Sequence, residues 1–169
     1  MYGSLEQFLE QVARRGSWVG GGSVAALGAA LSAALLEKLV VRPAAARRLR
    51  ALRRECVALI ERDATTFARV INATRSSNRR AFARSLKIAT EAPYRVFANA
   101  HLVRAMGRVE QRAIKPQFQS DVRCALALAS AAATSAETLV RTNLAWLKDR
   151  AYAAAMRKRL RQAIRAHVH

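Results

Sequence analysis

The sequence predicts an all-α fold, a bundle of five to six helices, several of them long, that forms one domain over residues 1–169. The length suits a single domain, and 52% hydrophobic residues are enough to build a core. Aromatic residues make up only 6%, with 7 Gly and 3 Pro, which disfavours a turn-rich sheet protein. Apolar residues recur every three or four positions, which is the spacing of helix faces.

Two helices are predicted near the N-terminus. Ser4 and Gln7 have the spacing of a capping box, and the helix that they begin ends near residues 15–16. Its apolar face holds Leu5, Phe8, Leu9 and Val12. Ser23 is predicted to cap a second helix over residues 24–40, whose Ala, Gly and Ser side chains let a neighbouring backbone approach closely. We expect this helix to be buried on most sides.

A third helix is predicted from Pro43, which suits a first turn, to Ala73. Its inward face contains Leu49, Leu52, Cys56, Leu59, Asp63, Thr66 and Val70. A carboxyl group therefore occupies a position where the pattern expects core.

The fourth helix is predicted from Asn78 to Arg112. Its inward positions are Phe82, Leu86, Ala89, Pro93, Val96, Ala100 and Val103. Pro93 has no backbone N–H, so we expect a kink and a carbonyl near Ala89 that needs another partner.

The last two helices follow a loop at residues 113–120. Ser120 and Asp121 begin the fifth helix, and Asp149 caps the sixth. The inward face of the fifth helix holds Val122, Ala125, Ala129, Ala132, Ala136, Leu139, Asn143 and Trp146. In the sixth helix the inward residues are Met156, Leu160 and Ile164.

The two cysteines, Cys56 and Cys124, lie in apolar helical stretches and are predicted to be buried thiols in a reducing compartment. They are too few for a disulfide scaffold or a multi-cysteine zinc site. The N-terminus lacks the basic head and apolar run of a signal peptide. The most apolar run, residues 24–36, is shorter than the roughly 20 residues of a membrane span. We therefore expect a cytoplasmic protein without a membrane partner.

The net charge predicts an anionic partner. Thirty Lys and Arg against eleven Asp and Glu leave +19 at pH 7. The arginine clusters at residues 47–54 and 157–161 are either solvated helix faces or a surface for a polyanion. The three histidines lack the spacing of a metal site or a catalytic triad, so no metal and no histidine mechanism are expected.

Several polar or side-chain-free residues occupy positions where a helical bundle normally has apolar core residues. A glycine-rich loop before the second helix consists of Gly20, Gly21, Gly22 and Ser23. It either presents free backbone donors to an anion or a carbonyl oxygen, or is an ordinary flexible turn. Asp63 must be ion-paired, for example with one of the many arginines, protonated or in contact with another polar group. Asp121 either caps its helix or functions, and Asn143 either binds a ligand or fixes helix register.

Five segments together resemble the formiminotransferase-cyclodeaminase family in order and spacing, over nearly the whole chain: GGGSVAALGAALSAALLEKL, ERDATTFARV, ATEAPYRVF, SDVRCALALA and TNLAWLKD. The resemblance implies an all-helical bundle that forms a homodimer. It also implies an enzyme that acts on a one-carbon unit carried by tetrahydrofolate.

The resemblance also assigns site residues. It places the family's acidic positions on Asp63 and Asp121, as candidate catalytic proton carriers. It implies substrate binding by Gly20, Gly21, Gly22, Ser23, Glu91, Ser120 and Asn143.

The chain departs from the family pattern in its loops. Trp18 and Val19 stand where the family usually has Thr-Pro. Ile114 and Lys115 stand where Gly-Asn precedes Pro, and Arg123 replaces a Gly. We expect Arg123, a bulky charged side chain one turn from the expected site, to narrow or reshape a pocket.

Three functions remain open on the sequence. The first is a folate enzyme, either a cyclodeaminase that releases ammonia or a methenyltetrahydrofolate cyclohydrolase that adds water, with no metal or redox cofactor required. Arginines would suit the polyglutamate tail of its substrate. The second is the family fold recruited to different small-molecule chemistry through its altered loops. The third is a basic helical module that binds nucleic acid.

Overall fold

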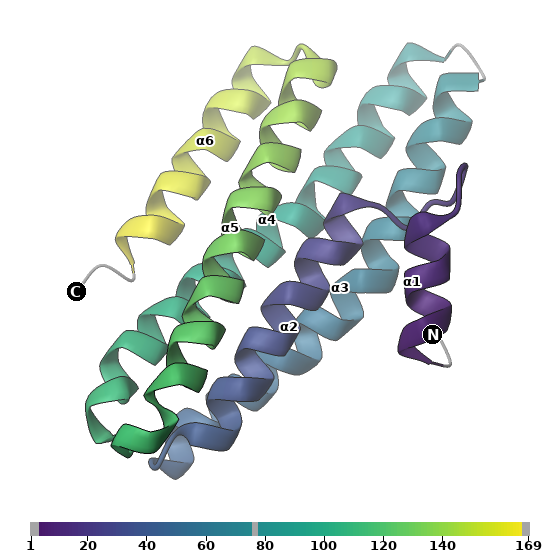
Figure 1. Cartoon of the computed structure of the whole chain (residues 1–169). Coiled ribbons are helices and arrows are strands. Elements are labelled where there is room, and N and C mark those ends of the chain that lie inside the picture. The colour runs from purple at the N-terminus through teal and green to yellow at the C-terminus, as the bar shows by residue number, and fades with distance from the viewer. Residues whose placement is uncertain (1–3, 76–77, 167–169) are drawn as a thin grey trace.

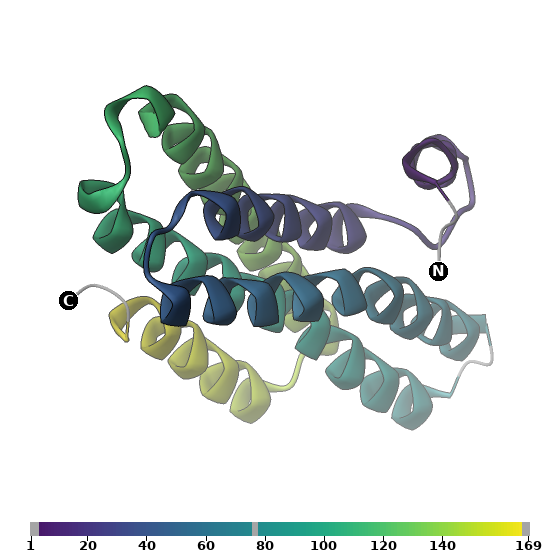
Figure 2. The ribbon, with the colours of Figure 1, turned by 90° about the horizontal axis from the view of Figure 1, so that it is seen from below.

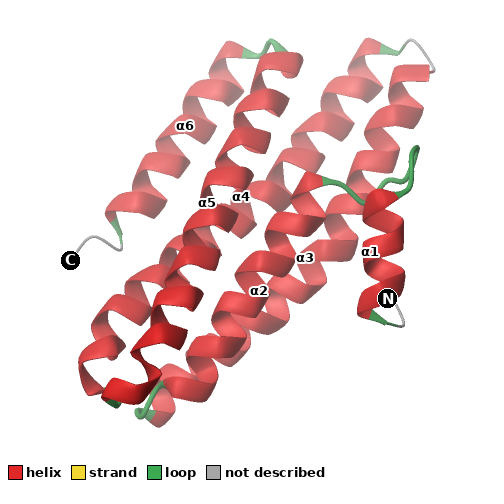
Figure 3. Ribbon diagram, in the orientation of Figure 1, coloured by secondary structure: helices red, strands yellow, loops and turns green. Residues whose placement is uncertain are grey.

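The computed structural model describes residues 4–75 and 78–166, and this part of the chain contains six α-helices and no strand (Figure 3). The helices are α1 (Leu5–Ala13), α2 (Gly21–Leu39), α3 (Pro43–Arg75), α4 (Arg79–Glu110), α5 (Gln119–Leu147) and α6 (Arg150–Arg165). Two short 3₁₀ turns, η1 (Gln111–Ala113) and η2 (Pro116–Phe118), lie in the connection between α4 and α5. The predicted all-α bundle is confirmed.

Helices α2 to α5 form a four-helix bundle, and α6 packs against α4 and α5 (Figure 1). Helix α1 stands to the side of the bundle, where Figure 2 shows it nearly end-on. It makes no extensive contact with another described helix. Phe8 is its single described core residue and Val12 packs against the core, whereas Leu5 and Leu9 are 64% and 54% exposed, so half of the predicted apolar face is uncovered.

Small side chains let α2 approach α5 closely, as the sequence predicts. Ser32 Oγ donates a hydrogen bond to the Ala125 carbonyl at 2.6 Å. A Cβ placed on Gly28 would lie 3.7 Å from the Cβ of Ala132, which is ordinary contact. By length and composition α2 is the one described helix that could cross a membrane. Packing against α3, α4 and α5 covers more than half of it.

Local capping sets most of the helix boundaries. The Ser4 and Gln7 capping box begins α1, and the Asn78 and Asp149 side chains cap α4 and α6, each accepting a hydrogen bond from a backbone N–H three residues on. The start of α2 differs from the prediction. Its N-cap is Gly20, without a side-chain cap, and Ser23 lies inside the helix.

Two further predictions about burial need correction. Cys56 is buried, and burial raises the pKa of its thiol to about 11, but Cys124 is exposed on α5. The inward face of α5 continues through Val140 and Leu144. Trp146, predicted to be inward, is 51% exposed.

Candidate active site

Asp63 lies on the inward face of α3, directly beneath the first turn of α2. A Cβ built on Gly22 would overlap the Asp63 carboxyl group. Only a residue without a side chain lets the carboxyl group come this close to the helix backbone. The third glycine of the loop is therefore needed for contact with Asp63, and the description of the loop as an ordinary flexible turn does not hold at this position.

Ser23 links α2 to α3 through its hydroxyl group. Its Oγ lies 2.9 Å from the Ile60 carbonyl oxygen and 3.2 Å from Asp63 Oδ2. The backbone N–H of Ser23 also donates to the Asp63 carboxyl group. Asp63 thereby satisfies a free donor at the start of α2, which a side-chain cap on that helix would otherwise do.

The surroundings of Asp63 favour its neutral form. Burial raises the pKa of this carboxyl group, while the hydrogen bonds from the Ser23 hydroxyl and backbone oppose the rise. The hydroxyl has a single proton, and the Ile60 carbonyl oxygen can only accept one. When Ser23 donates to Ile60, its contact with Asp63 Oδ2 is a hydrogen bond only if the carboxyl group carries a proton. Burial and these hydrogen bonds therefore act on the pKa in opposite directions, and burial is the larger effect.

Asp63 opens into a pocket of about 190 Å³ between the start of α2 and helices α3, α4 and α5. We call it the Asp63 pocket. Its lining is Trp18, Gly20, Gly21, Gly22, Asp63, Phe67, Ala89, Pro93, Leu139, Thr142, Asn143 and Trp146. Both tryptophans of the chain belong to it. Two broad aromatic surfaces next to a few polar groups are typical of a site for a flat heterocycle.

The structure also brings Pro93 to this pocket. Because Pro93 has no backbone N–H, the carbonyl of Ala89, four residues earlier, lacks its usual helical donor. Both residues line the pocket. The Ala89 carbonyl is thus a candidate acceptor for a ligand.

Four residues assigned by the resemblance do not line this pocket. Ser23 is fully buried against Asp63. Ser120 and Asp121 are at the opposite end of α5, and the 22 residues from Asp121 to Asn143 correspond to about 33 Å along the helix. Glu91 is held by Arg159, whose Nη1 and Nη2 lie 2.6 Å and 2.9 Å from the two carboxylate oxygens.

The departures from the family pattern fall in two places. Trp18 lines the Asp63 pocket, and Val19 is buried beside it in the core. Ile114, Lys115 and Arg123 lie in or near the α4 to α5 connection, at the end of the bundle that holds Asp121. Arg123, which was expected to narrow or reshape the pocket, does not line it, and Trp18 is the changed residue that does.

Sequence reasoning missed Phe67, Thr142 and the pocket role of Leu139 and Trp146. The stripe pattern predicts Leu139 and Trp146 to be core residues, whereas Asn143 is predicted as a ligand-binding candidate because it is polar. The stripe does continue, but into the pocket wall. A second apolar stripe, slightly rotated around the helix, runs through Val140 and Leu144 and forms the core at that end of α5. This second stripe is the sequence signal that Leu139 and Trp146 are free to line a pocket.

Fold and pocket together define a helical-bundle protein with a partly buried carboxyl group that opens into a pocket. The sequence matches the formiminotransferase-cyclodeaminase family over residues 4–162, and the chain belongs to this family. Its structure is similar to that of formiminotetrahydrofolate cyclodeaminase from Thermotoga maritima, with a TM-score of 0.89 and 22% identity. The likeness covers 95% of this chain and 87% of that chain and shows a shared fold. Curated protein sequences gave no match.

Proposed function

We propose that this protein is an enzyme of folate one-carbon chemistry that acts on formimino- or methenyl-tetrahydrofolate. Membership of the formiminotransferase-cyclodeaminase family supports this class of reaction. The observation that carries the proposal is the Asp63 carboxyl group, raised in pKa by burial and placed against the glycine loop in a pocket with both tryptophans. A neutral carboxyl group there is able to donate a proton.

In cyclodeamination, the second folate nitrogen attacks the carbon of the protonated formimino group and forms a tetrahedral centre that carries an amino group. Asp63 donates its proton to the departing amine, and the bond from that carbon to the amine nitrogen breaks. The Asp63 carboxylate then takes the proton of the attacking nitrogen, so the carboxyl group is regenerated as ammonia leaves. No electron is transferred, and we expect no redox cofactor.

In cyclohydrolysis, water attacks the methenyl carbon instead. The attacking water releases one proton to the solvent. One carbon–nitrogen bond of the tetrahedral centre then breaks, the freed nitrogen takes the Asp63 proton, and the new hydroxyl group returns its proton to Asp63 as it becomes the formyl carbonyl. The same carboxyl group supports both reactions, because each needs one proton carrier beside a tetrahedral carbon. The test below therefore uses both formiminotetrahydrofolate and methenyltetrahydrofolate.

We further propose how the ring system is held. The side chains of Thr142 and Asn143 and the carbonyl of Ala89 offer hydrogen-bond partners to the polar edge of a pterin. Trp18 and Trp146 offer faces for its rings. Because these are the only tryptophans in the sequence, quenching of intrinsic fluorescence reports occupation of this pocket.

The decisive test measures the rate of methenyltetrahydrofolate loss by absorbance and of ammonia release from formiminotetrahydrofolate. We expect the protein to accelerate one of the two, and Asp63→Asn to lower kcat by about 100-fold or more. Glu61→Gln, which removes an exposed carboxyl group from the same helix outside the pocket, is the control, and Asp121→Asn tests the second candidate proton carrier. A wild-type rate in Asp63→Asn would contradict the role of Asp63, and no acceleration of either substrate would contradict the function.

Asp121, Ser120 and Glu91 remain proposals as site residues. Asp121 and Ser120 reach the reacting carbon only from a second copy of the chain, because they lie at the far end of α5. A homodimer also suits the exposed Leu5 and Leu9 of α1. The cytoplasmic location likewise stays a prediction.

A second candidate function is nucleic-acid binding, favoured by how the charge is distributed. Stretches 37–54, 104–123 and 157–165 contain seventeen Lys and Arg but three Asp and Glu. Two of those acidic residues form ion pairs, Glu37 with Arg50 and Arg53, and Glu110 with Arg42. The stretches lie toward the end of the bundle away from the Asp63 pocket.

Binding of labelled duplex DNA and RNA at several salt concentrations tests this candidate. A steep loss of affinity with salt, unchanged in Asp63→Asn, would support it. Undetectable binding at low salt would eliminate it. The recruited-chemistry alternative rests on Trp18 and is supported only if another small molecule, and no folate, raises the melting temperature.

A further inference from the structure

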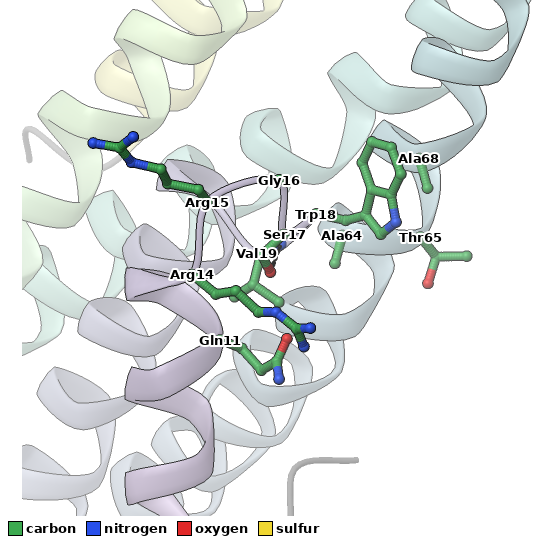
Figure 4. Close-up of a pocket in the computed structure, with 10 residues that line it drawn as sticks. All are labelled: Gln11, Arg14, Arg15, Gly16, Ser17, Trp18, Val19, Ala64, Thr65 and Ala68. Carbon is green, nitrogen blue, oxygen red and sulfur yellow. Dashed lines mark hydrogen bonds between the residues drawn. The ribbon is translucent and has the colours of Figure 1, made fainter.

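A second and larger cavity adjoins the Asp63 pocket. It measures about 500 Å³ and lies between the end of α1, the loop after it and α3. Figure 4 shows the lining side chains, among them Gln11, Arg14, Arg15, Trp18, Thr65 and Ala68. We call it the Arg14 cavity.

The two cavities share Trp18 and meet along α3. Asp63 and Phe67 line the Asp63 pocket, while the next residues, Ala64 and Ala68, line the Arg14 cavity. Figure 4 shows the Trp18 ring beside Ala64 and Ala68. These small side chains leave the indole as the main group between the two spaces.

The Arg14 cavity is cationic. Neither Arg14 nor Arg15 forms an ion pair with an acidic residue in the described ranges 4–75 and 78–166, and no acidic residue lines the cavity. Arg14 extends on the same side as the Gln11 amide, whereas Arg15 points away from it (Figure 4). A guanidinium beside an amide donor is suited to a carboxylate.

The size of the Asp63 pocket limits how much of a ligand it can enclose. At about 190 Å³ it is smaller than the pockets of roughly 300–1,000 Å³ that enclose whole drug-sized ligands. A pteridine ring system fits such a space, but a folate does not end there. The remainder of the molecule, an aminobenzoyl ring and one or more glutamates, needs an adjoining space that accepts an aromatic ring and carboxylates.

We infer that the Arg14 cavity binds the glutamate carboxylates of a folate whose pteridine ring occupies the Asp63 pocket. Arg14 and Gln11 hold the carboxylates, and Trp18, which lines both cavities, contacts the aminobenzoyl ring that passes between them as well as the pteridine. The inference rests on the proposed function, because that function places the pteridine at Asp63. It makes Arg14 a binding residue that determines preference for glutamylated substrates and has no part in the chemical step.

The test compares two ligands that differ only in the tail, tetrahydropteroylglutamate and tetrahydropteroate, in the full chain. Dissociation constants come from tryptophan fluorescence quenching and from calorimetry. We expect the wild type to bind the glutamylated ligand at least about tenfold more tightly, which is an ordinary gain for one charged carboxylate contact. Arg14→Gln should remove this preference and leave tetrahydropteroate binding unchanged.

Arg69→Gln is the matched control, because it removes the same charge from an exposed position on α3 that lines neither cavity. It should keep the wild-type preference. An equal loss in both variants, or an equal loss for both ligands in Arg14→Gln, would overturn the assignment of Arg14 while leaving the proposed function standing. If the wild type bound neither ligand, the proposed function would fall and this inference with it.

Discussion

Gly22 allows the Asp63 carboxyl group to pack directly against the backbone at the start of α2. Its missing side chain lets Asp63 reach the backbone N–H and the hydroxyl group of Ser23. Neither Asp63 nor Ser23 would be positioned without it, because any Cβ would overlap the carboxyl group.

Gly22→Ala should therefore lower the free energy of unfolding by about 1–3 kcal/mol, as overpacking does, although alanine is the better helix former. It should also weaken ligand binding, since Asp63 must move. Urea denaturation measures the first effect and fluorescence titration the second. Gly20→Ala is the control, because nothing lies within 4 Å of its added Cβ. Equal stability of the two variants would argue against the close contact at Gly22.

The pH dependence of stability tests the neutral carboxyl group. The pKa of Asp63 is raised in the folded state above the ordinary 3.8. The folded state then holds this proton more tightly than the unfolded state, so the stabilising contribution is complete below about pH 3.8 and is lost as pH rises through the folded-state pKa.

Asp63→Asn has no such proton to lose. Its free energy of unfolding should rise relative to the wild type as pH increases from about 4 toward neutrality, because burial of the charged form is avoided. Denaturation curves of both proteins across this window give the difference. A constant difference at every pH would show that the pKa of Asp63 is not raised.

At the scale of elements, α6 is held to α4 by a polar clamp. Arg159 forms two bonds to Glu91, and its guanidinium lies 3.9 Å from the centre of the Tyr94 ring. The Tyr152 hydroxyl donates to the Lys87 carbonyl on the same helix pair at 3.2 Å. In this structure the Glu91 side chain therefore joins two helices and does not line the Asp63 pocket.

Arg159→Ala should destabilise the protein by about 1–2 kcal/mol, because a bidentate ion pair and a cation–π contact are lost at a partly exposed site. Arg161→Ala, two residues along and exposed, should change stability by less than about 0.5 kcal/mol. Chemical denaturation of both variants checks the difference. The variant Glu91→Gln provides a second test. Unchanged substrate affinity would show that Glu91 serves only the clamp, and reduced affinity would show that it binds the substrate.

At the scale of the whole molecule, α1 exposes more apolar surface than its few contacts explain. Leu5 and Leu9 project from a helix that stands off the bundle. Because exposed apolar patches of this kind mark interaction surfaces, we expect a second copy of the chain to cover them.

Sedimentation velocity at micromolar concentration should find a dimer of the wild type. The double variant Leu5→Glu and Leu9→Glu should weaken association by at least about tenfold, because it buries charge at the contact. Val57→Glu, at an exposed apolar position on α3, should leave the dimer intact. A monomeric wild type would contradict this prediction.

The sequence by itself determined the helices and most of their buried faces. Caps at Ser4, Asn78 and Asp149 act on backbone groups three residues away, and the stripe of α3 depends only on helical spacing. It also indicated Asp63, Asn143 and the three glycines, because polar or side-chain-free residues stand out against an apolar pattern. Such features are local, so a sequence shows them directly.

Only the tertiary structure decided which of these residues meet. Asp63 and Gly22 are far apart in sequence and come into contact because α2 and α3 pack side by side. Periodicity placed Leu139 and Trp146 in the core, because a pocket wall and a core face have the same spacing along a helix. Asp121 and Asn143 are both polar residues that the sequence offers as site candidates, but they lie near opposite ends of α5. Contacts between helices depend on packing in three dimensions, which no single helix pattern contains.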